Sequence, residues 1–212
     1  ILGQDAGSLV LRDCVVMGTS ALDGSYNAVR TFRCDLVMED TVVRDNATVI
    51  AVSGAQSDIE IRRCRFENNP VQSVHCEGSG ANCIPRCNSA VVEDCVFEGT
   101  GLLALGSFTT LTVARNQFLR MPTGGCAVWS STASVQVNPF DRDSLTGTAA
   151  GAGLWADKLS GSIAWNTFYG CHSAALSGAT VLVRGVSPEA VFTNNVIAHS
   201  TGGPAGSVCS GA

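Results

Sequence analysis

The sequence predicts an all-β protein: a parallel β-helix of about eight coils, with three short strands in each coil. Three observations predict this fold class. The composition favours strands and turns, one eight-residue pattern recurs along nearly the whole chain, and inward and outward positions alternate inside each copy of the pattern. Together they indicate one elongated domain that spans residues 1–212.

The composition is that of a folded, strand-rich chain. Of the 212 residues, 45% are apolar and 15% are charged, which is too apolar for a disordered chain and low in charge for a helical one. Glycine occurs 23 times and Val, Thr and Ser are common, as in strands joined by turns. The formal net charge of −5 argues against nucleic acid as a partner. The sequence has no run of about 18 apolar residues, so it predicts no membrane-spanning helix.

The repeat has aliphatic residues at two positions, then an anchor that is Cys, Thr or Asn, and then Phe, Val or Ile. Its copies are LVLRDCVV (9–16), LVMEDTVV (36–43), IEIRRCRF (59–66), AVVEDCVF (90–97), LTVARNQF (111–118), ASVQVNPF (133–140), GSIAWNTF (161–168) and AVFTNNVI (190–197). The anchors are Cys14, Thr41, Cys64, Cys95, Asn116, Asn138, Asn166 and Asn195, spaced 21 to 31 residues apart. An ungapped motif separated by intervals of variable length indicates a solenoid with a fixed core and elastic loops.

Side-chain alternation explains each copy of the repeat. Residues two apart on a strand share a face, so Leu9 and Leu11 point to the same side. A two-residue bend follows, after which Cys14 and Val16 point into the same interior. A third strand is expected in the interval that follows, near residues 49–52, 102–105, 126–129 and 153–156. Three short strands per turn, stacked in parallel, make a β-helix.

The segments AVFTNNVI and GSIAWNTF resemble the repeat of the right-handed parallel β-helix proteins of the pectate-lyase-like superfamily. The resemblance covers residues 9–197 and implies a right-handed helix with inward ladders of Asn, aliphatic and aromatic residues. It also implies that a site, if there is one, lies on the outer face of the sheet of third strands and its flanking loops. Enzymes of this superfamily are mostly polysaccharide lyases and hydrolases. The N-T-D, D-D, G-H-D and R-I-K motifs of its hydrolases are absent from this sequence.

The repeat predicts two interior ladders and one exterior ladder. The interior ones are a stack of five phenylalanines and a row of asparagine amides: Phe66, Phe97, Phe118, Phe140 and Phe168, and Asn116, Asn138, Asn166 and Asn195. The two outward positions before the anchor alternate in charge: Arg12, Glu39, Arg62 and Glu93 at the first, and Asp13, Asp40, Arg63, Asp94 and Arg115 at the second. We interpret them as a salt-bridge ladder, in preference to an Asp cluster for calcium.

Ten cysteines are more than a cytosolic protein usually carries, so an extracellular or cell-surface location is expected. Those at the anchor position are expected to be buried free thiols: Cys14, Cys64 and Cys95. The segment CEGSGANCIPRC lies in the longest interval between anchors. A local disulfide is expected there, from Cys76 to either Cys83 or Cys87.

The candidate catalytic residues lie in and after the loop NPFDRDSLTG (138–147). Asp141, Asp143 and Asp157 could present three carboxylates beside the cation of Arg142 or Lys158, as a lyase needs to neutralise a uronate and abstract its α-proton. The alternative is that these aspartates cap backbone groups in a turn. No cofactor is expected, although such carboxylates could accept calcium. Two tryptophans are candidate sugar contacts on successive coils: Trp129 and Trp155.

The expected function is that of a non-catalytic module, secreted or displayed at the cell surface, that contacts carbohydrate or serves in adhesion. Two alternatives stay open: a polysaccharide lyase or hydrolase acting on an acidic glycan, and a purely structural stalk or passenger domain. The expected partners are a polysaccharide or cell-surface glycan and the rest of a longer chain. The chain opens ILGQDAGS, with neither Met nor a signal-peptide pattern, so it is expected to be a piece of a longer protein.

Overall fold

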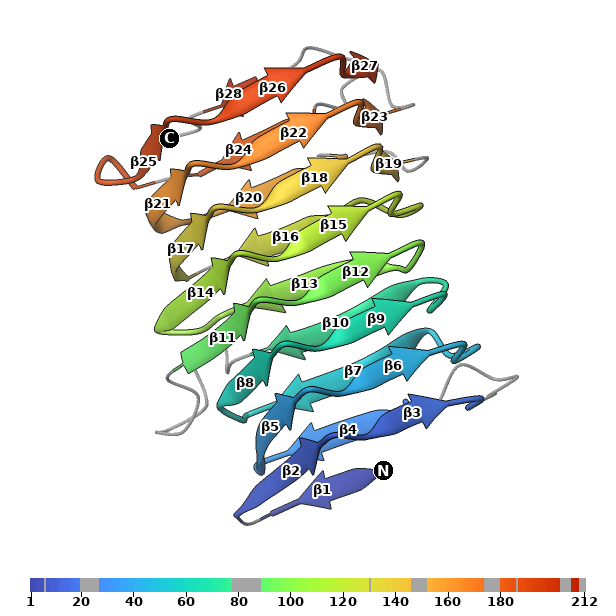
Figure 1. Ribbon diagram of the computed structural model, residues 1–212. Helices are drawn as coiled ribbons and strands as arrows, with labels where there is room; N and C mark the ends of the chain where they lie inside the picture. The colour runs from blue at the N-terminus through green and yellow to red at the C-terminus, as the bar shows by residue number, and fades with distance from the viewer. Residues whose placement is uncertain are drawn as a thin grey trace.

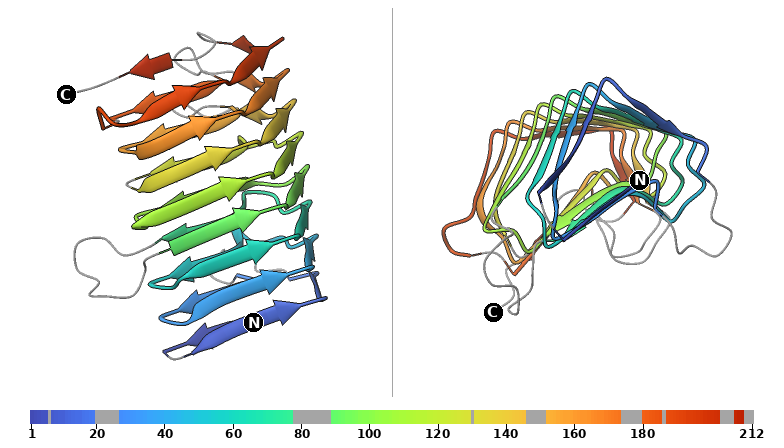
Figure 2. Two further views of the ribbon diagram at one scale, coloured as in Figure 1. Left: turned by 60° about the vertical axis from the view of Figure 1, so that its left-hand side comes forward. Right: turned by 90° about the horizontal axis from the view of Figure 1, so that it is seen from below.

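The computed structural model describes residues 1–5, 7–19, 27–77, 89–129, 131–145, 152–173, 180–185, 187–202 and 207–209. These residues form strands, bends and turns and contain no helix. The strands make three parallel sheets that wind around one core as a rod (Figure 1). Viewed along the rod, successive coils lie over one another (Figure 2). The predicted fold class, an all-β parallel solenoid with three strands per coil, is confirmed.

Each sheet takes one strand from every coil. Sheet A contains β1 (Leu2–Gln4), β4 (Val29–Phe32), β7 (Ile50–Ala55), β10 (Gln72–Glu77), β13 (Leu102–Gly106), β16 (Cys126–Trp129), β20 (Leu154–Asp157), β24 (Val181–Arg184) and β28 (Ser207–Cys209). Sheet B contains β2 (Ser8–Arg12), β5 (Asp35–Glu39), β8 (Ile59–Arg62), β11 (Ser89–Glu93), β14 (Thr110–Ala114), β17 (Thr132–Gln136), β21 (Ser160–Ala164) and β25 (Val191–Thr193).

Sheet C contains β3 (Val15–Met17), β6 (Val42–Arg44), β9 (Arg65–Glu67), β12 (Val96–Glu98), β15 (Gln117–Leu119), β18 (Pro139–Asp141), β22 (Thr167–Tyr169) and β26 (Val196–Ala198). A short fourth sheet joins β19 (Ser144–Leu145), β23 (His172–Ser173) and β27 (Thr201–Gly202). Sheets B and C each have eight strands among the described residues. The first and the last of these strands have a neighbour on one side only. The rod therefore has six coils that are stacked on both sides, slightly fewer than the eight expected.

The two interior ladders form as the repeat predicts. The rings of Phe66, Phe97, Phe118, Phe140 and Phe168 stack with centroids 4.5 to 5.1 Å apart and interplanar angles of 4° to 13°. In the amide ladder, Asn138 Nδ2 donates to Val113 O at 3.0 Å and to Asn166 Oδ1 at 2.9 Å. Its Oδ1 accepts from the backbone N–H of Asn116 at 2.9 Å. Each amide therefore satisfies backbone groups that the bend would otherwise leave buried and unpaired.

One residue with a left-handed backbone makes the bend between sheets B and C in every coil. These residues are Asp13, Asp40, Arg63, Asp94, Arg115, Val137, Trp165 and Asn194, with φ between 49° and 60°. The residue after each of them is the inward-pointing anchor. The other two corners of most coils repeat this device, as at Asp45 and Gln56 in the second coil. The two-residue bend read from the sequence is therefore the corner of the solenoid.

The exterior charge ladder also forms. Arg63 makes two hydrogen bonds with the carboxylate of Asp40, at 2.9 and 3.0 Å, and Arg115 does the same with Asp94, at 2.8 and 2.9 Å. The Arg63 and Arg115 guanidinium groups lower the pKa of Asp40 and Asp94, respectively. These side chains are exposed, so each pair contributes little to stability, but opposite charges favour the observed register.

The cysteines correct two expectations. Cys64 and Cys95 are buried free thiols, as predicted, whereas Cys14 is a free thiol that is only partly buried, because it lies in the first coil at the end of the rod. Cys76 is also a free, fully buried thiol. It lies on the inward face of β10, a strand that the sequence did not reveal, and not in a loop. Burial raises the pKa of its thiol to about 12. Cys76 therefore does not form the expected local disulfide; Cys83 and Cys87 lie outside the described residues.

Candidate functional site

The three candidate carboxylates lie in three different environments. Asp141 is on β18 in sheet C and forms an ion pair with Arg142 at 2.8 Å. Asp157 is on β20 in sheet A. Asp143 is fully buried in the core. The structure therefore does not gather these residues into one catalytic cluster. Two of the carboxylates sit on the outer faces of different sheets, and the third faces the interior.

Asp143 belongs to a second ladder of inward residues, at the corner that follows sheet C. The ladder contains Asn46, Asn69, Thr100, Met121 and Asp143. The backbone N–H of a ladder residue donates to the side-chain oxygen of the ladder residue in the next coil, wherever that next residue is polar. Asp143 Oδ1 accepts from Met121 N at 2.9 Å, whereas Oδ2 is buried and has no hydrogen-bond partner among the described residues. Burial raises the pKa of Asp143 well above its ordinary value. Its position is thus that of a ladder residue, equivalent to the asparagines three and four coils earlier.

Lys158 occupies the left-handed corner after β20, with φ of 52°, and its side chain is exposed. It follows Asp157 directly, so both residues lie near the edge of sheet A. Across the described ranges, no group of three His, Cys, Asp or Glu residues is arranged to hold a metal ion. Calcium binding remains an expectation from the sequence.

The two candidate tryptophans lie side by side on the outer face of sheet A. Trp129 ends β16, and Trp155 is the second residue of β20. Their ring centroids are 6.2 Å apart, with an interplanar angle of 25°. The ring of His75, from β10, meets Trp129 edge-on with centroids 6.0 Å apart. Both indoles are partly exposed. The sequence thus identified an aromatic cluster correctly, although it gave no sign of the histidine.

The indole of Trp129 lies against a small residue of the neighbouring strand. Gly106 pairs with Trp129 in register, and a Cβ at Gly106 would collide with that indole. Two alanines on the outer face of the same sheet, Ala104 and Ala127, are also buried. Nε1 of Trp155 is buried and has no hydrogen-bond partner. An indole N–H is a donor only, so this N–H is an unsatisfied buried donor, and the accessible part of the cluster is the apolar surface of the two rings.

The outer face of sheet B has a feature that the sequence reading missed. In the fifth to seventh coils, its outward residues form two rows of hydroxyls: Thr110, Thr132 and Ser160, and Thr112, Ser134 and Ser162. A groove of about 440 Å³ lies over this face, and one of about 640 Å³ lies at its edge near Lys158. The signal is in the sequence as T-x-T, T-x-S and S-x-S at the same place in three successive repeats.

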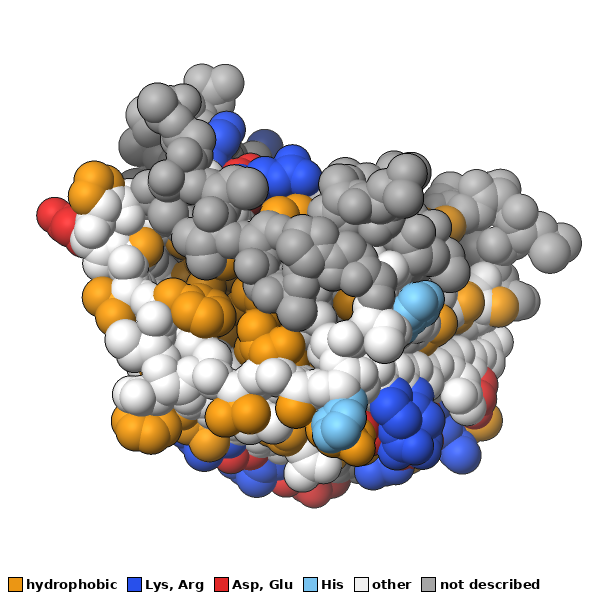
Figure 3. Space-filling model, turned by 90° about the horizontal axis from the view of Figure 1, so that it is seen from above, with side chains coloured by type: hydrophobic (Ala, Val, Ile, Leu, Met, Phe, Trp, Pro, Cys, Tyr) orange, Lys and Arg blue, Asp and Glu red, His pale blue; other side chains and the backbone are white. Residues whose placement is uncertain are grey.

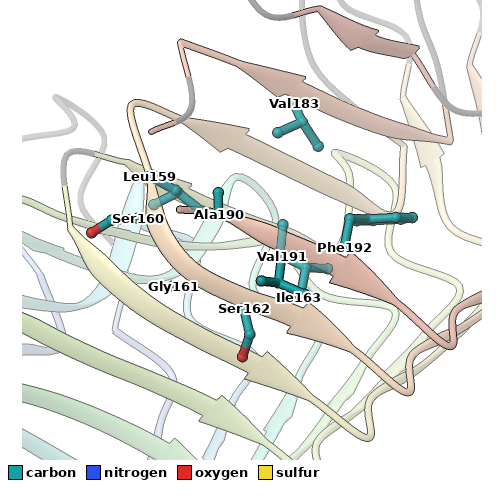
Figure 4. A pocket seen from close by; sticks show the side chains of 9 residues that line it. All are labelled: Leu159, Ser160, Gly161, Ser162, Ile163, Val183, Ala190, Val191 and Phe192. Atoms are coloured by element: carbon teal, nitrogen blue, oxygen red, sulfur yellow. The ribbon is translucent and has the colours of Figure 1, made fainter. Parts of the chain in front are cut away.

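A small apolar cavity of about 60 Å³ lies at the end of the rod, between β21, β24 and β25. In Figure 4, the hydroxyl oxygens of Ser160 and Ser162 point away from Val183, so these two hydroxyls do not line its apolar side. Phe192 occupies an inward position beside the cavity, yet it is 40% exposed because β25 has a neighbour in sheet B on one side only. Hydrophobic side chains are accordingly visible on this end of the molecule (Figure 3). The cavity follows from incomplete packing at the terminal coil.

The fold and these surfaces define the chain as a parallel β-solenoid with three sheets, an aromatic cluster on one outer face and hydroxyl rows on another. No protein-family model, no curated protein and no solved structure matches the chain. No helix capable of crossing a membrane occurs in the part of the chain that the structure describes.

Proposed function

We propose that this chain is a non-catalytic carbohydrate-contacting module of a secreted or cell-surface protein, built on the repeat of the pectate-lyase-like superfamily. The observation that carries the proposal is the Trp129–Trp155 cluster on the outer face of sheet A. Partly exposed indoles bind sugars well because their apolar faces pack against the C–H faces of the ring.

The arrangement of carboxylates favours a binding role over catalysis. A lyase or hydrolase needs an acid or base within hydrogen-bond reach of the same substrate atoms as its partner group. Here Asp143 is enclosed in the core, and Asp141 and Asp157 belong to different sheets. Catalysis on an acidic glycan and a purely structural stalk remain the two alternative functions, and the second requires no ligand at all.

The experiment that tests the proposal is a glycan array probed with the wild-type chain and with Trp155→Ala. Losing one stacking partner is expected to weaken binding about tenfold. Tyr169→Ala removes an exposed aromatic residue of sheet C and serves as the matched control, with binding unchanged. Circular dichroism of each variant verifies the fold.

Two results would count against the proposal. Absence of any glycan signal for the wild-type chain favours the structural stalk. Equal signals from wild type and Trp155→Ala would remove the aromatic cluster as the binding site. Release of unsaturated or reducing products from a bound polysaccharide would instead support the enzyme alternative.

A further inference from the structure

Trp165 is the third tryptophan of the chain and lies far from the aromatic cluster in the fold. It forms the corner between β21 and β22 and is 63% exposed. Its φ is 60°, a left-handed conformation that bulky residues adopt rarely and at a cost. The same corner holds Asp, Arg or Asn in six of the eight coils. Neither burial nor backbone preference explains a tryptophan here, so its exposed ring points to a ligand.

The strand that leads to Trp165 belongs to the hydroxyl rows of sheet B. Ser162 points outward three residues before Trp165, about 10 Å away along the strand. Within the first row, Thr132 Oγ1 and Ser160 Oγ are hydrogen-bonded at 3.0 Å; in the second row, Ser162 Oγ accepts from Gln136 Nε2 at 3.2 Å. The hydroxyls therefore repeat at the strand spacing of about 4.8 Å, and those of Thr132, Ser160 and Ser162 are oriented by these hydrogen bonds.

The chemistry of sheet B changes abruptly between its fourth and fifth strands. The last outward position of each strand carries the charge ladder in the first four coils: Arg12, Glu39, Arg62 and Glu93. In the next four it carries Ala114, Gln136, Ala164 and Thr193. The guanidinium of Arg115, which follows β14, is engaged by Asp94. The outward positions of the described strands β14, β17 and β21 thus carry hydroxyls, an amide and small residues, and the charged groups Glu189 and Lys158 lie at the C-terminal side and at the edge of these strands.

The shape of this face suits an elongated ligand. The groove of about 440 Å³ crosses the three strands over Thr112, Ser134 and Ser162, and Glu189 and Val191 close it at the C-terminal side. The groove at the edge of the sheet, about 640 Å³, shares Thr132 with it and extends to Lys158. The exposed ring of Trp165 lies at the opposite corner of the same sheet. Trp165 therefore follows directly on the strand whose outward side chains, Ser160 and Ser162, belong to the hydroxyl rows.

We propose that the fifth to seventh coils of sheet B form a second binding site, and that its ligand is an uncharged polysaccharide. The Trp165 indole packs against the apolar face of a sugar ring, and the Thr and Ser hydroxyls act as donors and acceptors toward sugar hydroxyls. An acidic glycan would bring carboxylates beside Glu189, in a groove whose described lining contains no cation, since Lys158 lies in the neighbouring groove at the edge of the sheet. The site goes beyond the proposed role of Trp129 and Trp155, which occupy a different sheet.

The test is affinity electrophoresis of the wild-type chain in gels that contain hydroxyethyl cellulose, xyloglucan or galactomannan, with polygalacturonate as the acidic comparison. Trp165→Asn is the informative variant, because Asn194 occupies the same corner one coil later and Asn tolerates its backbone conformation. The variant should fold at least as well as the wild type and bind about tenfold more weakly. Arg63→Asn makes the equivalent change on the charged half of the face and should leave binding unchanged.

A second variant tests the hydroxyl rows. Ser134→Glu places a carboxylate among them, at a position where the third coil already carries Glu60, so the fold should accept it. Retardation by an uncharged polysaccharide should be lost in this variant. Retardation by polygalacturonate alone, or by none of the gels, would overturn the inference. Retardation that survives Trp165→Asn but disappears in Trp155→Ala would overturn it too, while supporting the function proposed for sheet A.

Discussion

At the scale of single residues, Asp143 is an ionisable side chain in an unfavourable, buried environment. Its Oδ2 is buried without a partner, whereas Asn69, in the same ladder, donates from Nδ2 to Val43 O at 3.0 Å. By the same register, an asparagine at 143 would donate to the carbonyl of Phe118. Asp143→Asn is therefore expected to stabilise the protein at pH 7 by about 1–3 kcal/mol, since it removes an unsatisfied and ionisable buried group. Urea unfolding of the two proteins measures the difference.

The pH dependence of stability provides the control for this prediction. Burial raises the pKa of Asp143 in the folded state above its unfolded value, so the group stabilises the fold below about pH 4. That contribution is lost as the pH rises through the folded pKa. The neighbouring ionisable groups, Asp141 and the Cys171 thiol, do not reverse this sign. The wild type should thus lose stability on going from pH 4 to pH 7 relative to Asp143→Asn. Parallel pH profiles for the two proteins would contradict the assignment.

At the scale of the structural elements, the phenylalanine stack is the main interior support of sheet C. Phe118 is fully buried between Phe97 and Phe140, with centroid distances of 5.1 and 4.5 Å. Phe118→Ala is expected to cost about 3–5 kcal/mol in free energy of unfolding. Phe192→Ala, at the exposed end of the rod, should cost clearly less because that ring is 40% exposed. Chemical denaturation of both variants provides the comparison, and equal losses would refute a cooperative stack.

The sequence predicted the elements of sheets B and C well, because each copy of the repeat spans both strands and the corner between them. It predicted sheet A only in part. The strands near residues 102–105 and 126–129 were expected, but β10 and β24 were not, since they follow intervals of variable length without a fixed motif. That gap explains the error at Cys76. The sequence also separated outward from inward positions correctly, yet the hydroxyl rows emerge only when outward residues are compared across coils.

At the scale of the whole molecule, each coil contacts only its neighbours, so the ends are expected to open before the centre. The described thiols report on this directly, because Cys14 lies in the first coil and is partly exposed, whereas Cys126 lies in the fifth coil and is fully buried. Burial also raises the pKa of the Cys126 thiol, which lowers its reactivity further. In native buffer, a thiol reagent should modify Cys14 much faster than Cys126. Mass spectrometry of timed samples identifies the order, and simultaneous modification would indicate global unfolding instead.

The left-handed corners between sheets B and C have a consequence for how such a protein can change. Asp, Arg, Val, Trp and Asn all occupy this corner with nearly the same φ. The path of the backbone there is thus set by the stacked coils and their inward anchors, and not by the identity of the corner residue. A substitution at one corner alters the surface of one coil and leaves the surfaces of the neighbouring coils unchanged. Specificity for a repeating polymer could therefore change one coil at a time, in evolution or by design.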